Sequence, residues 1–247
     1  MQFQITSAAK FAALAILAAS AAPSFAQSAG DTVVSAGWAH IAPQDSSTPL
    51  VITSPNIPGV AGPKVGSGAS VDPTNTLEVS IDRFLTDNWV ASLDIGVPPT
   101  YKLIGTGTFA PIGQIGTAKQ WAPALLGKYY FGTAQTAFRP ILGLGIAHVS
   151  YSDVSLSNSF QTYGQQQGFD SSAVSTAKLG SSWVPVFNAG ASYAIDKDWY
   201  ASFTVSYVKL KTTADLTINP TLVGSVQGNT TLTLNPIVLY AAIGYRF

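Results

Sequence analysis

Along the last segment of the sequence, apolar and polar side chains alternate with a period of two, and this alternation restricts the fold more than any other feature. The odd-numbered positions are all apolar or aromatic: Ile237, Leu239, Ala241, Ile243, Tyr245 and Phe247. The positions between them include Gly244 and Arg246. Successive side chains of a strand point to opposite faces, so the segment predicts a strand with one face suited to lipid and the other to an interior.

The same period recurs in three earlier segments. At 199–207 the sequence places Trp199, Phe203 and Tyr207 on one face and serine and threonine on the other. At 77–82 and 89–97 one face is again apolar, while the opposite face carries serine and acidic residues. Four segments therefore predict, independently, a sheet with an apolar outer face. In the first candidate strand, 31–42, apolar and polar residues do not alternate clearly. Its parity, meaning which alternate positions face lipid and which face the interior, stays open.

Such a sheet is compatible with few classes of protein. The chain has 247 residues, of which only 10% are charged and 47% are apolar, whereas about 25% are charged in an ordinary soluble domain. After residue 26 no run approaches the roughly 18 apolar residues of a membrane helix, which excludes a helical membrane protein. Equal numbers of acidic and basic residues provide no basic patch for nucleic acid. The absence of cysteine excludes disulfides and thiolate sites.

The first 26 residues have the pattern of a signal peptide. Lys10 precedes an apolar run at 11–22, and the tripeptide at 24–26 has the small-x-small sequence that signal peptidase accepts. Cleavage is expected after Ala26, although an N-terminal core helix is the alternative. The mature chain, 27–247, is therefore expected to be an exported single domain.

The mature sequence predicts eight long strands. Gly, Pro, Asn, Asp and Ser residues delimit them at 31–42, 75–85, 89–98, 119–131, 138–151, 182–195, 199–212 and 231–247. Three connections are tight, at 86–88, 132–137 and 196–198, and four are long, at 43–74, 99–118, 152–181 and 213–230. Strands of this length suit tilted spans of a bilayer, which need about 9 to 11 residues. The predicted fold is an all-β, eight-stranded antiparallel transmembrane β-barrel with short periplasmic turns and long extracellular loops.

Aromatic residues are placed near both ends of these strands, as the two girdles of a membrane barrel require. Near the short turns they are Trp89, Tyr129, Phe131, Phe138, Tyr193, Trp199, Tyr245 and Phe247, and near the long loops Trp121 and Trp183. The alternative is the scattered core aromatics of a soluble sandwich, which does not explain an outward face this apolar.

By parity, a set of charged side chains points into the predicted barrel: Glu78, Asp82, Asp94, Lys128, Arg139 and Arg246. Each lies in the half of its strand nearer to a short turn or to the C-terminus. An eight-stranded barrel is just wide enough to be filled by side chains, and buried charges persist when they are paired. We therefore expect three acids to meet three bases in a plug that blocks flow to the periplasm. The alternative is that the pairs only stabilise the barrel.

Above this predicted plug the inward positions become apolar. They include Leu126, Val184, Val186, Val208, Leu210, Leu232, Leu234 and Val238. A polar lumen is usual in such barrels, and apolar clefts at barrel mouths are common ligand pockets. The pattern predicts a hydrophobic channel, whereas an apolar filling that simply packs the barrel is the alternative.

Two prolines interrupt the predicted barrel wall. Pro123 and Pro185 lie inside the fourth and sixth strands, where each removes a ladder donor. A channel that is closed below needs a side exit, so a lateral opening into the bilayer is one consequence of these prolines. An ordinary β-bulge is the other.

Taken in order along the chain, several short motifs resemble the OmpW family. They are the turn 86–89, the strand 122–131, the segment 138–145, Ser181 to Trp183, Asp198 to Tyr200 and the C-terminal run 235–247. The resemblance covers nearly the whole mature chain and implies an outer-membrane barrel with a narrow hydrophobic channel, closed toward the periplasm. Small apolar molecules would enter it and leave sideways. The resemblance also implies that the barrel-assembly machinery reads Phe247. Outer-membrane lipids are expected as further partners, and no cofactor is expected.

Two other functions stay open at this point. A structural or receptor barrel would act through its long loops, whereas a lipid-modifying enzyme would need an activated nucleophile. His148 and Ser150 lie two positions apart on the lipid face, with Asp153 as a candidate orienting group, but residues two apart on a strand need not touch. His40 has no partner at metal-ligand spacing, so no metal site is expected.

Overall fold

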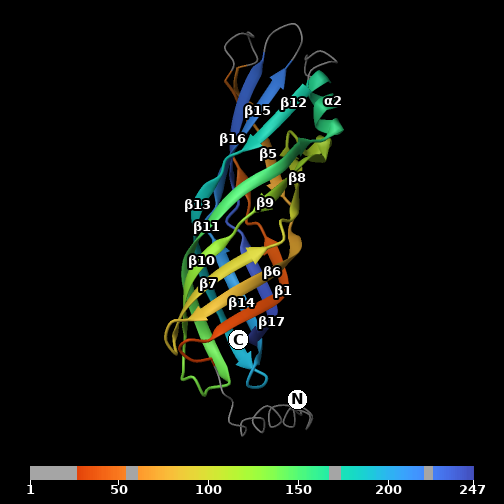
Figure 1. Cartoon of the computed structure of the whole chain (residues 1–247). Coiled ribbons are helices and arrows are strands. Elements are labelled where there is room, and N and C mark those ends of the chain that lie inside the picture. The colour runs from red at the N-terminus through yellow and green to blue at the C-terminus, as the bar shows by residue number, and fades with distance from the viewer. Residues whose placement is uncertain (1–26, 54–60, 167–173, 220–224) are drawn as a thin grey trace, which may run out of the picture.

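Eight antiparallel strands close into a barrel, which forms the lower part of a long cylinder (Figure 1). The computed structural model describes residues 27–53, 61–166, 174–219 and 225–247, and the predicted signal peptide, 1–26, lies outside them. Within these ranges the barrel strands are β1 (Thr32–Ala42), β6 (Thr74–Phe84), β7 (Trp89–Gly96), β10 (Ala124–Tyr130), β11 (Phe138–Leu156), β13 (Ser182–Ala194), β14 (Trp199–Val208) and β17 (Ile237–Arg246). Pairing of β1 with β17 and of β10 with β11 closes the sheet, which confirms the predicted fold class.

The tight turns gather at one rim of the barrel, as the alternating connection lengths predict. They join β6 to β7, β10 to β11 and β13 to β14, and the C-terminus lies at the same rim (Figure 1). In the last of them, the Asp196 carboxylate accepts the main-chain N–H groups of Asp198 and Trp199, both at 2.8 Å. These hydrogen bonds hold the pKa of Asp196 below its usual value.

Exposure alternates along the strands with the predicted parity. In β7, Trp89 is exposed while Ser92 is buried. The structure also settles the parity of β1, in which Val33 and Ala39 are buried inside the barrel and Trp38 is 48% exposed.

A band of exposed apolar side chains surrounds the barrel. It includes Leu77, Val79, Ile81, Ile95, Leu125, Leu142, Leu144, Ile146, Phe187, Phe203, Val205 and Ile243. Aromatic pairs flank the band near the short-turn rim, where the ring centroids of Trp89 and Tyr129 and those of Trp199 and Tyr245 are both 5.1 Å apart. Apolar surface of this extent is stable only when a bilayer covers it. Among the described residues, no helix is long and apolar enough to cross a membrane.

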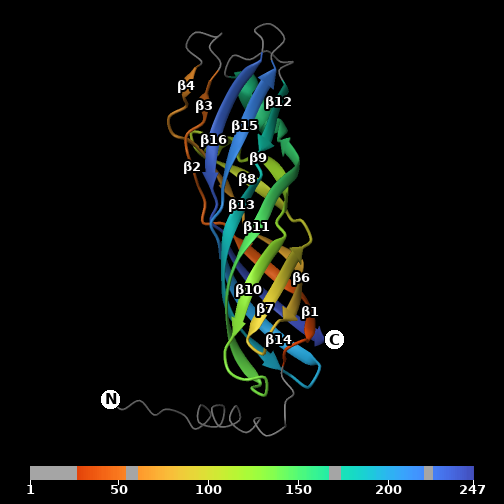
Figure 2. The same ribbon diagram turned by 60° about the vertical axis from the view of Figure 1, so that its left-hand side comes forward.

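The long connections carry further strands instead of irregular loops. These are β2 (Ser46–Ser47), β3 (Val51–Ile52), β4 (Gly62–Pro63), β5 (Ser67–Val71), β8 (Thr100–Gly107), β9 (Gln114–Trp121), β12 (Val174–Leu179), β15 (Lys211–Asn219) and β16 (Val226–Thr233). One group, ordered β12-β15-β16-β3-β4, forms a second sheet, while β9, β8 and β5 continue outward from the upper half of β11 (Figure 2). Helix α2 (Asn158–Gln166) and the short helix η1 (Ala110–Ile112) complete this extension.

Three predicted strands are broken where the extension begins. The segment 119–131 divides at 122–123, 199–212 divides at 209–210, and 231–247 divides at 234–236. Proline explains the first and third breaks, because Pro123 and Pro236 carry no N–H for a ladder bond. Asn235 adds a φ of 34°, which an extended strand does not contain.

Three glycines allow neighbouring strands to approach closely enough to close so narrow a barrel. A Cβ atom at Gly37, Gly145 or Gly190 would collide with a main-chain carbonyl oxygen of the next strand, that of Ala241, Leu125 or Phe203 respectively. Glycine in a strand interior is typical of such close approaches.

We expect Gly145→Val to lower the free energy of unfolding by about 1–3 kcal/mol, because the new side chain must displace the adjacent strand. Gly127→Val is the matched control, since a Cβ there meets nothing nearer than a carbonyl oxygen at 3.9 Å. Urea titration in detergent micelles, read by heat-modifiable gel mobility, compares the two variants. Equal stability of both would contradict the role of Gly145.

Candidate functional site

Lys128 is the centre of a polar network inside the barrel, built from inward positions of β6, β7 and β10. Its ammonium lies 3.1 Å from Asp82 Oδ1 and 3.5 Å from Asp94 Oδ1. The hydroxyls of Ser80 and Ser92 donate to the same Asp94 oxygen at 2.7 and 2.8 Å. Lys128 is 5% exposed and Asp82 6%. The structure thus brings together three of the six charges that parity placed in the lumen.

Arg139 does not join this network, contrary to the expected arrangement. Its guanidinium donates instead to the main-chain carbonyls of Gln27, Asp87, Tyr130 and Phe131. It also lies over the rings of Phe84 and Tyr130, at 5.9 and 5.3 Å from their centroids. Arg139 therefore holds the short-turn rim together. Parity gave the direction of this side chain but not its depth in the barrel.

Arg246 and Glu78 also lie outside the expected plug. Arg246 is at the rim, where it pairs with Asp31 at 3.4 Å and with Asp198 at 3.5 Å. Glu78 lies on the opposite side of the network, and within the described residues no hydrogen bond or ion pair involves its carboxylate. The expectation that three acids meet three bases is wrong, because Lys128 is the only one of the three bases that reaches the luminal carboxylates in the described structure.

Between the network and the short-turn rim, buried side chains fill the lumen. They are Val33, Phe84, Val90, Tyr130, Ile141, Ala194 and Tyr200. The rings of Phe84 and Tyr130 meet edge to face with centroids 5.1 Å apart, and the Tyr130 hydroxyl donates to Asp82. This filling was not among the predictions from the sequence, although the inward parity of Val90 and Tyr200 was its signal.

On the other side of the network is a cavity of about 110 Å³, the luminal cavity. Predicted channel residues that line it are Leu126, Val186, Val208, Leu210 and Val238. Its wall toward the network is polar and includes Glu78, Asp94 and Tyr240. Val184 does not line the cavity but packs in the same buried cluster. The luminal cavity is thus an apolar chamber with an acidic floor.

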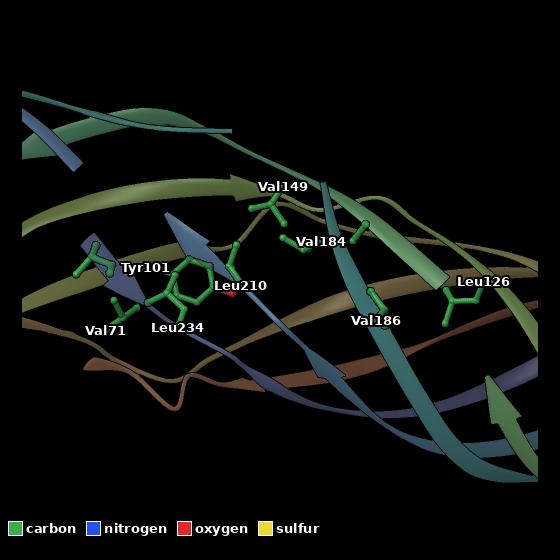
Figure 3. Packing of buried hydrophobic residues seen from close by; sticks show 10 residues of the cluster. Val71, Tyr101, Leu126, Val149, Val184, Val186, Leu210 and Leu234 are labelled. Atoms are coloured by element: carbon green, nitrogen blue, oxygen red, sulfur yellow. The ribbon is translucent and has the colours of Figure 1, made fainter. Parts of the chain in front are cut away.

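Further cavities continue outward from this chamber. The neck, of about 20 Å³, is lined by Tyr101, Leu210 and Leu234 among others, and Figure 3 shows these three side chains packed beside Val71. Leu232 lines both the neck and the next space, the outer cavity of about 90 Å³. A mouth of about 500 Å³ lies beyond. The cavities form a series that narrows from the outside toward the neck and has largely apolar walls.

Residues of the extension supply much of the neck, and the sequence analysis did not name them. They are Val71, Tyr101, Leu103, Tyr151 and Leu179. Four of them lie in segments expected to be loops, and Tyr151 ends a predicted strand. The period-two spacing of Tyr101 and Leu103 was the signal for a strand there.

The barrel wall is interrupted beside Pro123, one of the two predicted openings. Pairing of β7 with β10 ends at Asp94 and Ala124. It resumes where the Gln120 N–H donates to the Pro99 carbonyl at 3.1 Å, and β8 and β9 continue it from residues 100 and 119. Ala122, within this interruption, is exposed and also lines the luminal cavity. The cavity therefore approaches the outer surface at this point.

At Pro185 the wall is paired on both sides. Pro185 lies opposite Ile146 of β11, and its carbonyl accepts the N–H of Lys209 at 3.1 Å. The prediction of an opening at Pro185 is therefore wrong. The proline has no N–H group to donate, but its carbonyl still accepts a hydrogen bond from the next strand.

The residues considered for catalysis have other partners. The His148 ring lies 4.8 Å from that of Trp183, and Asp153 pairs with Lys119 at 3.4 Å instead of orienting His148 and Ser150. At the C-terminus, Phe247 is 75% exposed; its reading by the assembly machinery stays a prediction.

We expect Lys128→Met to lower the free energy of unfolding by about 3–5 kcal/mol, because it leaves Asp82 and Asp94 without their counter-ion. Lys197→Met, which removes a lysine that is 72% exposed, is the control and should have little effect. Urea unfolding in micelles compares the two. An unchanged midpoint for Lys128→Met would show that the network contributes no stability.

The whole described barrel matches known proteins. The OmpW family model matches residues 28–247. Outer membrane protein W of Vibrio cholerae is 31% identical over 236 residues, covering 95% of this chain and 97% of that protein. The dibenzothiophene metabolism operon protein PahQ of Pseudomonas aeruginosa is 26% identical, covering 82% of each chain. The crystal structure of OprG from Pseudomonas aeruginosa superposes with a TM-score of 0.75 at 26% identity, covering 90% of this chain and 98% of that one. The chain therefore belongs to the OmpW family of outer-membrane β-barrel proteins.

Proposed function

We propose that this protein is a channel for the uptake of small hydrophobic molecules across the outer membrane. The observation that carries the proposal is the series of cavities with largely apolar walls, which narrows from the mouth to the neck and widens again at the luminal cavity. Barrels that pass hydrophilic solutes have polar interiors, whereas apolar pockets take apolar ligands. The name of the relative PahQ supports the proposal, because dibenzothiophene is an apolar molecule.

The charged network and the filling beneath it give this channel a closed end. Transfer of an apolar molecule past Lys128 would require it to separate buried ion pairs and to displace the rings of Phe84 and Tyr130. Separating a buried charge from its partner costs several kcal/mol. The route toward the periplasm is therefore unfavourable for a hydrophobic molecule.

The exit in this proposal is sideways, through the interruption beside Pro123. Gly96, Pro99 and Ala122 line the luminal cavity there, and their small or rigid side chains leave little to displace. An apolar molecule gains roughly 25 cal/mol for each Å² that it removes from water, so the bilayer core is its favoured destination.

We expect Leu234→Asp to reduce uptake of a short alkane at least tenfold, because it places a charge in the neck, where Leu234 is 6% exposed. Uptake by cells with and without the protein is measured beside a hydrophilic solute, and heat-modifiable mobility verifies folding. Val174→Asp, at an exposed position of β12, is the control.

The outcomes separate a channel from the alternative roles. Faster alkane uptake by wild type, lost only in Leu234→Asp, supports the channel. Equal uptake with and without the folded protein would reject it and favour a structural or receptor barrel that acts through its extension.

We expect Ala122→Trp to slow release of an apolar fluorophore into liposome bilayers several-fold while its binding to the protein is retained, because indole fills the interruption in the wall. Ala91→Trp, at an exposed position of the same barrel, is the control. Unchanged release from Ala122→Trp would place the exit elsewhere.

A further inference from the structure

The floor of the luminal cavity has more carboxyl groups than nearby cations to pair with them. Glu78, Asp82 and Asp94 face the lumen, and Lys128 pairs with the latter two. Arg139, the next cation below, directs its N–H groups to main-chain carbonyls. The excess carboxyl group faces a cavity with otherwise largely apolar walls, where charge is costly without a partner.

Acceptor atoms on this floor are left free by the network. Every hydrogen bond and ion pair that Asp94 makes within the described residues uses Oδ1, which leaves Oδ2 without a partner among them. Glu78, which also lines the cavity, contributes both of its oxygens. The floor therefore offers carboxylate acceptors to a ligand that donates hydrogen bonds.

Asn188 has a second unpaired acceptor atom beside the network, although it is not one of the residues that line the luminal cavity. It is 5% exposed, and its amide donates to the hydroxyl of Ser206, which lines the luminal cavity. Its Oδ1 is buried with no hydrogen-bond partner in the described structure. A Cβ at Gly143 would lie 3.4 Å from this oxygen and 3.1 Å from Lys128 Cγ, so the oxygen lies beside the network. Buried polar atoms are rarely left unpaired, so this oxygen is an exception in the described structure.

We propose that Glu78 and Asp94 bind the ammonium head of a short alkylamine at the floor of the luminal cavity. An ammonium carries three N–H donors and no acceptor, which matches a floor of free acceptors. The alkyl tail lies upward among Leu126, Val186 and Val238. An inorganic cation fits less well, because it has no apolar part to cover the walls formed by Leu126, Val186 and Val238.

The inference rests on the proposed channel for the route by which the amine reaches the cavity, but binding itself is testable without transport. The full chain in detergent micelles is titrated with n-hexylammonium and with n-hexanol, which has the same tail and no charge. At low ionic strength, wild type is expected to bind hexylammonium at least tenfold more tightly than hexanol. Equal or weaker binding of hexylammonium would overturn the proposal, and this comparison needs no variant.

Glu78→Gln keeps the size of the side chain and removes its charge. It is expected to weaken hexylammonium binding at least tenfold and to leave hexanol binding unchanged. Asp215→Asn, which neutralises an exposed acid of β15, should change neither. Unchanged hexylammonium binding by folded Glu78→Gln, or equal weakening of both ligands, would overturn the assignment to this carboxylate.

Two further comparisons separate related explanations. Hexylammonium is expected to bind more tightly than methylammonium, and equal affinity would reject a site for amphiphiles in favour of a site for any cation. If the wild-type protein binds hexylammonium but cells that contain it take up alkane no faster than cells without it, the site is supported and the proposed channel is rejected.

Discussion

Closure of a sheet of only eight strands is the constraint on which the rest of this structure depends. A bilayer offers no water to unpaired main-chain groups, so a spanning sheet must close on itself. Here β1 pairs with β17 and β10 with β11, and glycines such as Gly145 and Gly190 permit the close approach of neighbouring strands. A barrel this narrow has an interior that side chains alone can fill. Every inward residue therefore affects either packing or passage.

The distribution of charge in the lumen follows from this narrowness. Lys128 satisfies Asp94 on the adjacent strand β7 and Asp82 on β6, the strand beyond it. Arg139, one strand further on, lies too near the rim to reach them and binds turn carbonyls instead. Aromatic filling occupies the space between these two cations, while apolar cavities lie beyond Lys128. The barrel is thus divided along its axis into a filled end and a hollow end.

The hollow end belongs as much to the extension as to the barrel. Tyr101 from β8 meets Leu210 and Leu234 at the neck, although these residues are far apart in the sequence (Figure 3). Without the strands of the extension the luminal cavity would open directly to the outside. The same transition from barrel to extension interrupts the wall beside Pro123, so the neck and the proposed exit have a common structural origin.

Much of the fold could be predicted from the sequence, because parity is a local property. The alternation of Trp199, Phe203 and Tyr207 with polar residues requires only that the segment be a strand, and the structure agrees. The inward direction of Lys128, Leu126 and Val238 followed in the same way. The break at 209–210 could not be predicted, because the two-residue period continues through it, whereas Pro123 and Pro236 were sequence signals for the other two breaks.

By itself, the sequence determined, for every barrel strand except the first, which side chains face lipid and which face the lumen, and hence the class of barrel. Only the tertiary structure decided which of those side chains meet. The depth at which a residue lies depends on the register between strands that are distant in the chain. That register gave Lys128 two carboxylates, gave Arg139 none, and left Glu78 facing an apolar cavity. The register depends on hydrogen bonds between two strands, so the sequence of either strand alone does not determine it.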